Sequence, residues 1–291
     1  MEVVQLLLGG IASGCIYGLI ALGFVLIYKA TESVNFAQGD MMMLGAFITL
    51  QLTNTDYWNL PFWAAVPLAI AIMAVIGYGL EALVIRKLFG QPQFAVVILT
   101  IAIGFVLRFI AGFIWGHQPQ SLETPFTGIN LRFSGLVIGL DEVFVIGVTL
   151  VLTLGLYLFF AKTKLGIAMQ AASQNQLAAY YMGVPVKLIN GIIWAMAGGI
   201  AAVAGVMFAA RGAIDPSMGL LGIKAFAAAV IGGFGSLPGA LIGGLIIGII
   251  EPFAARYGAP GYSQIAPYAL MLLVLVLRPN GLFSQVQSKK V

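Results

Sequence analysis

Long apolar runs, separated by short polar breaks, constrain this sequence more than any other feature. Several runs reach the roughly 20 helical residues that are needed to cross a bilayer core of about 30 Å. Lipid offers the backbone no hydrogen bonds, and the long alternation of apolar and polar residues that a membrane barrel needs is missing. Charged residues make up 8% of the chain, against about a quarter in soluble proteins. The sequence therefore predicts an all-α polytopic membrane protein.

We expect about eight to nine transmembrane or re-entrant helices. The apolar segments cover residues 5–28, 39–53, 61–85, 94–115, 143–161, 191–210, 222–231, 239–250 and 264–277. Several of them are shorter than a full crossing. Such helices are tolerated at membrane depth only where protein or a water-filled cavity covers the backbone. Together the segments predict a single transmembrane domain over residues 1–291.

Basic residues in the short loops predict the orientation, because cytoplasmic loops carry an excess of Lys and Arg. Nine of the 14 basic residues fall on one side if the linker with Lys162, Lys164 and Lys187 is cytoplasmic. The N-terminus is then outside and the C-terminus inside. The basic residues are scattered singly and form no stripe, so we expect contact with membrane lipid and none with nucleic acid.

An internal similarity relates the two halves of the chain. Residues 23–47 align without gaps with residues 205–229, which places Lys29 on Arg211. Each copy is an apolar span, a basic end, a short polar segment and a second apolar span, and the two copies run in opposite directions in this topology. The alignment predicts an inverted repeat, in which transport sites form at the repeat interface. The alternative is a chance similarity between two apolar segments.

Polar side chains in the two short breaks are the candidates for lining a transport pathway. They are Asn35 and Gln38 in the first copy, and Asp215 and Ser217 in the second. Asp40 belongs to the same polar stretch, but a carboxylate is also favoured at a helix N-terminus. We therefore expect Asp40 to cap the helix that begins near residue 39.

The remaining titratable residues form no catalytic or metal-binding set. Glu81 lies one helical turn from Arg86, which favours an ion pair near the inner surface. Glu251 is expected at the outer end of a span, because Pro252 follows it. The only histidine, His117, falls in the outer loop without a second ligand nearby. We expect no enzymatic activity, no catalytic residue, no metal and no cofactor bound by this chain.

Glycines recur four residues apart in the segment IGGFGSLPGALIGGLIIGIIE, residues 231–251. They are Gly235, Gly239, Gly243, Gly244 and Gly248. This spacing leaves bare backbone on a helix face and lets another helix approach closely. Helix packing is one interpretation, and a broken helix that lines a transport path is the other.

Residues 161–190 are the most distinctive polar segment. Residues 170–182 can form a helix of small and amide side chains, after which Gly183 provides a stop and Pro185 prevents continuation. The segment is too polar to span a membrane. The residues alone favour equally a helix that docks into a groove of a partner protein and an amphipathic connector at the membrane surface.

Four stretches together resemble the permease family of ABC importers for branched-chain amino acids, the LivH type. They are residues 18–47, 163–186, 232–251 and 277–283, and their order and spacing cover nearly the whole chain. The resemblance implies a transmembrane subunit that moves branched-chain amino acids into the cytoplasm without an ATPase of its own. Import of urea, amides or other amino acids by the same architecture is one alternative, and an ion-coupled secondary transporter is another.

The resemblance also implies partners and a location in the bacterial cytoplasmic (inner) membrane. The partners are a second homologous permease or a second copy of the chain, two cytoplasmic ATPase subunits that hold ATP and Mg, and a periplasmic or lipid-anchored binding protein. Residues 161–190 become the expected ATPase-coupling segment, with candidate contacts at Ala171, Gln174, Asn175, Ala178 and Gly183. The importer signature of Glu-Ala-Ala and a glycine four residues later is not present as such, because Gln170 replaces the Glu.

Overall fold

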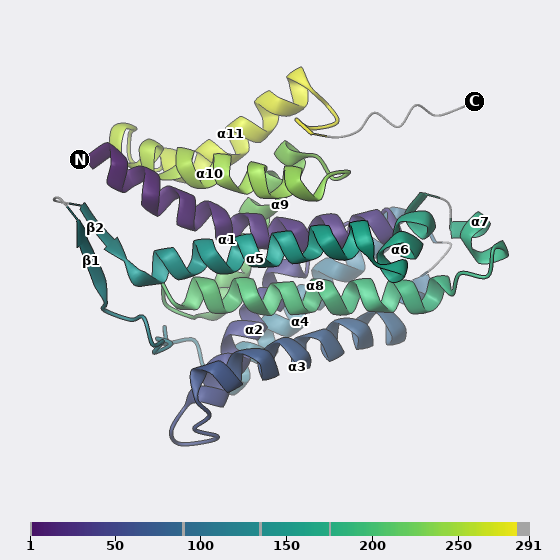
Figure 1. Cartoon of the computed structure of the whole chain (residues 1–291), viewed down its shortest axis with the longest axis horizontal. Helices are drawn as coiled ribbons and strands as arrows, with labels where there is room; N and C mark the ends of the chain where they lie inside the picture. Colours follow the sequence, from purple (N-terminus) through teal and green to yellow (C-terminus); the bar gives the residue numbers. More distant parts are fainter. Residues whose placement is uncertain (1, 89–90, 134–135, 175, 284–291) are drawn as a thin grey trace.

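The computed structural model describes residues 2–88, 91–133, 136–174 and 176–283, which form a helical bundle with one small β-hairpin (Figure 1). The elements in chain order are α1 (Glu2–Thr31), α2 (Gln38–Thr53), α3 (Phe62–Leu83), η1 (Ile85–Leu88), α4 (Gln93–Trp115), β1 (Asn130–Phe133), β2 (Leu136–Gly139), α5 (Leu140–Lys162), α6 (Lys164–Gln174), α7 (Gln176–Tyr181), α8 (Val186–Ala209), η2 (Pro216–Leu220), α9 (Leu221–Gly232), α10 (Leu237–Tyr257) and α11 (Tyr262–Leu277). The predicted all-α polytopic class is confirmed.

Six helices in the described part of the chain are long and apolar enough to cross a membrane: α1, α3 with η1, α4, α5, α8 and α10. The shorter apolar helices are η2 with α9, α11 and the 16-residue α2. Every predicted apolar segment is helical. One predicted end was wrong, because α10 continues through Pro252 to Tyr257 and so reaches 21 residues. The proline is accommodated inside this helix, where the sequence indicated a stop.

The helices pack in the pattern that an inverted repeat requires. Helices α1 and α8 lie side by side and run in opposite directions (Figure 1). The most extensive contacts are those of α1 with α10 and of α8 with α3. An inverted repeat makes α1, α2 and α3 correspond to α8, α9 and α10, in that order. The contact of α1 with α10 then corresponds to the contact of α8 with α3. The contacts of α1 with α9 and of α8 with α2 correspond in the same way, so the packing supports the predicted repeat.

Glycines allow α10 to approach two neighbours at once. A Cβ on Gly244 or Gly248 would overlap the backbone of α1 near Gly14. A Cβ on Gly239 or Gly243 would instead meet the backbone of α9. Four of the five predicted glycines therefore lie at close helix contacts, on two faces of α10 and not on one.

Gly235 differs from the other four glycines. It lies in the turn before α10, and no heavy atom lies within 4 Å of the position that its Cβ would take. The packing role predicted for Gly235 is therefore not seen. In α1 the matching set Gly10, Gly14 and Gly18 has the same four-residue spacing and faces α10. Sequence reasoning missed these three, although their spacing was the signal that could have found them.

The segment between α4 and α5 contains the antiparallel β-hairpin, in which Asn130 pairs with Gly139. An isolated bridge between Gln120 and Ile214 ties this segment to the loop after α8. Arg211, just after α8, binds Glu142 at the start of α5, with 3.1 Å between Nη2 and Oε1. The loops at this end of the bundle are thus held together by backbone pairing and by charge.

Candidate functional site

The two polar breaks meet inside the bundle. Gly39 in the first turn of α2 lies against Gly219 and Gly222, where η2 leads into α9. A Cβ on Gly39 would overlap the carbonyl oxygen of Gly219, so only glycine allows this approach. Two short helices, one from each repeat, therefore begin next to each other. Helix N-termini carry partial positive charge, and such half-helices build the binding sites of many transporters.

Asp40 lies at this meeting point and forms an ion pair with Arg108 of α4. The Asp40 Oδ1 atom accepts hydrogen bonds from Arg108 Nη2 at 2.8 Å and from Nε at 3.1 Å. The expectation that Asp40 caps α2 was wrong: the N-cap is Ala37, without a side-chain cap, and Asp40 is the third helical residue. Tertiary packing gives the carboxylate a stronger partner than the helix amides. The signal for this pairing in the sequence was Arg108, because a cation within an apolar span needs an acidic partner.

Asn35 and Gln38 are fully enclosed by protein, with exposed fractions of 1% and 0%. The Asn35 Oδ1 atom accepts from the amide of Ala37, and its Nδ2 donates to Gln38 Oε1 at 3.4 Å. Gln38 Nε2 donates to the carbonyl oxygen of Ala197 in α8. In this conformation the two amides fix the start of α2 against α8.

Asp215 and Ser217 lie in a different place from Asn35 and Gln38. They line a cavity of about 540 Å³ between α4 and the loop that carries η2. Asp215 caps η2, because its Oδ1 accepts from the backbone amide of Ser217 at 2.6 Å. Arg108 lines the same cavity, which we call the α4 cavity, so this arginine connects it to the buried Asp40.

Two further carboxylates pair with cations. Glu81 is fully buried and accepts two hydrogen bonds from Arg86, which confirms the predicted ion pair. Glu251 was expected at a helix end, but it lies inside α10 and binds Lys224 of α9 and the hydroxyl of Tyr17. Among the described residues, no group of three or more His, Cys, Asp or Glu is placed to hold a metal ion.

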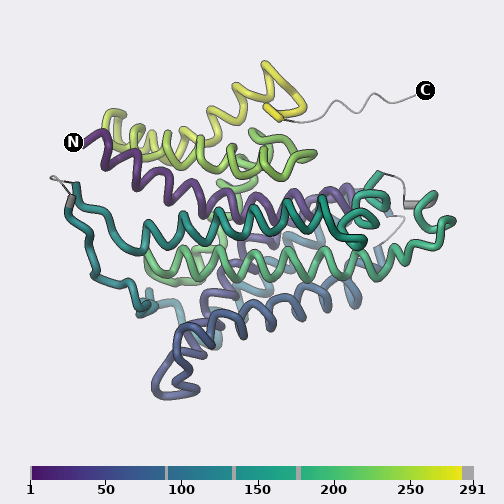
Figure 2. Tube along the Cα trace, viewed as in Figure 1, coloured from purple at the N-terminus to yellow at the C-terminus, as the bar shows by residue number. Residues whose placement is uncertain are grey.

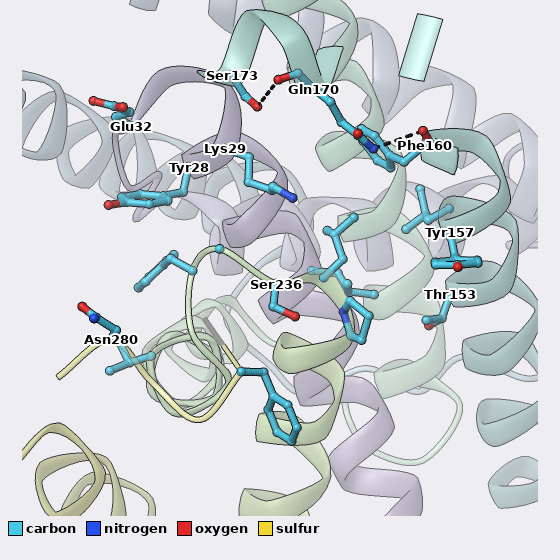
Figure 3. A pocket seen from close by; sticks show the side chains of 18 of the residues that line it. Tyr28, Lys29, Glu32, Thr153, Tyr157, Phe160, Gln170, Ser173, Ser236 and Asn280 are labelled. Atoms are coloured by element: carbon cyan, nitrogen blue, oxygen red, sulfur yellow. Dashed lines mark hydrogen bonds between the residues drawn. The ribbon is translucent and has the colours of Figure 1, made fainter. Parts of the chain in front are cut away.

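A larger cavity, of about 990 Å³, opens at the end of the bundle that carries α6 (Figure 3). We call it the α6 cavity. Tyr28, Lys29 and Glu32 line it from the end of α1, and Gln170 and Ser173 line it from α6. The turn before α10 and the C-terminal segment close another side, with Ser236 and Asn280.

Between the end of α5 and the start of α8, the polar segment over residues 161–190 contains two helices, α6 and α7, where the sequence predicted one over residues 170–182. Figure 2 shows both at the end of the bundle away from the N-terminus. Gly183 has a φ of 84° and ends α7 as predicted, with its amide bonded to the carbonyl of Tyr180. Ala171, Gln174 and Ala178 are exposed, and Asn175 lies outside the described residues.

Large exposed side chains on and just after α7 were missed by sequence reasoning. Tyr180, Tyr181 and Met182 are 66%, 77% and 84% exposed. Such a patch on a polar segment is typical of an interaction surface. The signal in the sequence was the run of three large residues directly before the glycine stop.

Comparison with known proteins gives the family of this chain. The model of the family "Branched-chain amino acid transport system / permease component" matches residues 6–275. The permease BraD of Pseudomonas aeruginosa, named for high-affinity branched-chain amino acid transport, is 31% identical over 99% of this chain and 97% of its own length. The permease LivH of Escherichia coli, named for the same transport, is 30% identical with the same coverage. The fructose import permease FruG of Bifidobacterium longum is 28% identical over 89% of this chain and 78% of its own length. The chain belongs to the family of branched-chain amino acid transport system permease components.

Proposed function

We propose that this chain is the transmembrane subunit of an ABC importer that moves branched-chain amino acids into the cytoplasm. The observation that carries the proposal is the identity of 30% or more over 99% of the chain to two permeases named for this cargo. The shared length includes the short helices α2 and α9 and the α6–α7 segment. The chain itself is not an enzyme, and ATP hydrolysis belongs to separate subunits.

The proposed location is a bacterial cytoplasmic membrane, with α6 and α7 on the cytoplasmic side. This orientation follows from the excess of Lys and Arg on that side. The bundle end with α6 and α7 also carries the end of α1 with Lys29 and the start of α8 with Lys187. The opposite end carries the N-terminus and the β-hairpin (Figure 1).

The proposed assembly contains two permeases, two ATPase subunits that hold ATP and Mg, and a substrate-binding protein on the outer side. The second permease is a homologous chain or a second copy of this one. We assign ATPase docking to the exposed patch of Tyr180, Tyr181 and Met182 together with Ala171, Gln174, Asn175, Ala178 and Gly183. Short helices that enter a groove are a common mode of such docking.

The contacts of α6 provide a physical route from docking to transport. Gly166 of α6 lies against the backbone of Phe159 in α5, and Gln170 Nε2 donates to the carbonyl oxygen of Phe160 at 3.1 Å (Figure 3). Met169 and Ala172 pack in one cluster with Leu26 of α1. A push on α6 is therefore transmitted to α5 and α1. We propose that closure of the ATPases uses this link to switch the path between inward-facing and outward-facing states.

The test is purification of the complex in detergent and uptake in liposomes. The proposal predicts recovery of two ATPase chains and a second permease, and leucine uptake that requires ATP and the binding protein. A secondary transporter would show ion-driven uptake by this chain alone, which would overturn the proposal. Because FruG is a fructose permease and the alternatives include urea, the same liposomes are tested with leucine, urea and fructose. Uptake of urea or fructose without leucine would overturn the proposed cargo.

A further inference from the structure

The α4 cavity presents both signs of charge beside an apolar wall. Arg108 and Asp215 line it together with Ser217, Phe105, Phe109 and Leu220. Its volume of about 540 Å³ lies within the range of small-molecule sites. We infer that this cavity binds the zwitterionic head and the aliphatic side chain of the transported amino acid, an assignment that rests on the proposed function.

Arg108 is positioned to receive a carboxylate. Its Nε and Nη2 atoms both donate to Asp40 Oδ1, and Nη1 has no hydrogen-bond partner among the described residues. The Arg108 side chain is 26% exposed, whereas that of Asp40 is 6% exposed. The buried Asp40 thus binds the guanidinium of Arg108 on the protein side, and the guanidinium faces the cavity on the other side. Planar guanidinium groups match carboxylates in geometry and charge.

Asp215 is positioned to receive an ammonium group. Its Oδ1 atom accepts from the Ser217 amide, and no cation pairs with this carboxylate among the residues that the structure describes. A carboxylate beside a cavity within a membrane protein normally has a partner. The α-ammonium group of an amino acid supplies that partner.

Phe105, Phe109 and Leu220 form the apolar wall and are 63%, 72% and 49% exposed. The guanidinium carbon of Arg108 lies 5.6 Å from the centre of the Phe105 ring, which orients the cation at the edge of this wall. A branched aliphatic side chain buries its surface here while the two charges hold the head group. The arrangement therefore selects an amino acid that is charged at one end and apolar at the other.

The open side of the cavity also suggests what covers it. If α4 faced only lipid here, Arg108 would be exposed to hydrocarbon, which is unfavourable for a cation. A second permease placed against α4 would cover the charges and bring two such cavities together. An anionic lipid headgroup is the competing occupant, because its phosphate would also satisfy Arg108.

The experiment measures protection of an introduced thiol in the full importer complex in lipid nanodiscs. Ser217→Cys places the thiol in the cavity, and the only native cysteine, Cys15, is buried. We expect L-leucine to slow labelling by a water-soluble thiol reagent. The analogues 4-methylpentanoate and 3-methylbutylamine, which each lack one charge, are expected to protect about tenfold less effectively, because each loses a charged hydrogen bond. Ser121→Cys, exposed and outside the cavity, is the control whose labelling leucine should not change.

Two variants in the Ser217→Cys background test the charge assignment. Arg108→Lys keeps the charge beside Asp40 but loses the guanidinium, and Asp215→Asn removes the ammonium partner. Each should reduce protection by leucine about tenfold. Protection by the two analogues that equals protection by leucine, or full protection by leucine in both variants, would overturn the site. Leucine-independent protection that appears only in nanodiscs with phosphatidylglycerol would assign the cavity to lipid. Leucine uptake by the unmodified complex is measured separately, so failure of the site is distinguished from failure of the proposed function.

Discussion

Asp40 of α2 and Arg108 of α4 form an ion pair with 2.8 Å between Oδ1 and Nη2. The two residues lie on different helices and are 68 positions apart in the chain. It lies where the short helices of the two repeats begin, and Gly104 and Gly219 leave the space that the carboxylate occupies.

The first prediction concerns the contribution of this ion pair to the stability of the folded protein. Asp40→Asn leaves a cation without its acid and should destabilise the folded protein by about 3 kcal/mol, the lower end of values for breaking a buried pair. The double variant Asp40→Asn with Arg108→Gln removes both charges and should recover part of that loss. Thermal unfolding in detergent measures the difference, and equal stability of the Asp40→Asn variant and the unmodified protein would contradict the structural role.

The second prediction concerns the contact of α10 with α1. Gly248→Leu places a side chain against the backbone of Gly14, and overpacking of this kind costs about 1–3 kcal/mol or more. The matched control is Gly155→Leu in α5, where nothing lies within 4 Å of the Cβ position. The melting temperature should fall for the first variant and stay close to the unmodified value for the second. Equal melting temperatures for the two variants would show that the α1 contact is not tight.

The third prediction concerns coupling to the ATPases. Ala178→Glu adds a charge to the exposed α7 and should lower transport-coupled ATP hydrolysis about tenfold if a complementary groove must desolvate that charge. Insertion and folding should be unaffected. Ser121→Glu, at an exposed position in the loop after α4, serves as the control for a surface charge. Unchanged uptake in Ala178→Glu would remove α7 from the interface.

The fourth prediction concerns the network around Glu251. The carboxylate accepts from Lys224 and, at 2.6 Å, from the hydroxyl of Tyr17. Tyr17→Phe removes one hydrogen bond to a charged group and should cost about 1.5–3 kcal/mol of stability. In a Glu251→Gln background the same substitution should cost less, because the hydroxyl then binds a neutral amide. Equal costs in the two backgrounds would show that the two side chains are not coupled.

The local patterns of the chain predicted its local structure well. The helices over residues 2–31 and 93–115 follow from apolar runs of membrane-spanning length. The stop at Gly183 follows from glycine's ability to adopt a positive φ. These features depend on residues close together in sequence, so their physical causes are visible there. The continuation of α10 through Pro252 is one exception, since one proline in an apolar run does not by itself decide whether a helix ends.

The sequence by itself determined that this chain is a helical membrane protein, and it predicted related halves and close helix contacts at glycines. Lipid imposes that outcome, because each backbone group needs a partner and each span needs a fixed apolar length. Only the tertiary structure decided which polar groups meet. It placed Gln38 against α8, paired Asp40 with Arg108, and brought Arg108 and Asp215 to the lining of one cavity. Such pairs depend on how distant helices rotate and cross, and many partners for one charge are equally compatible with its position in the chain.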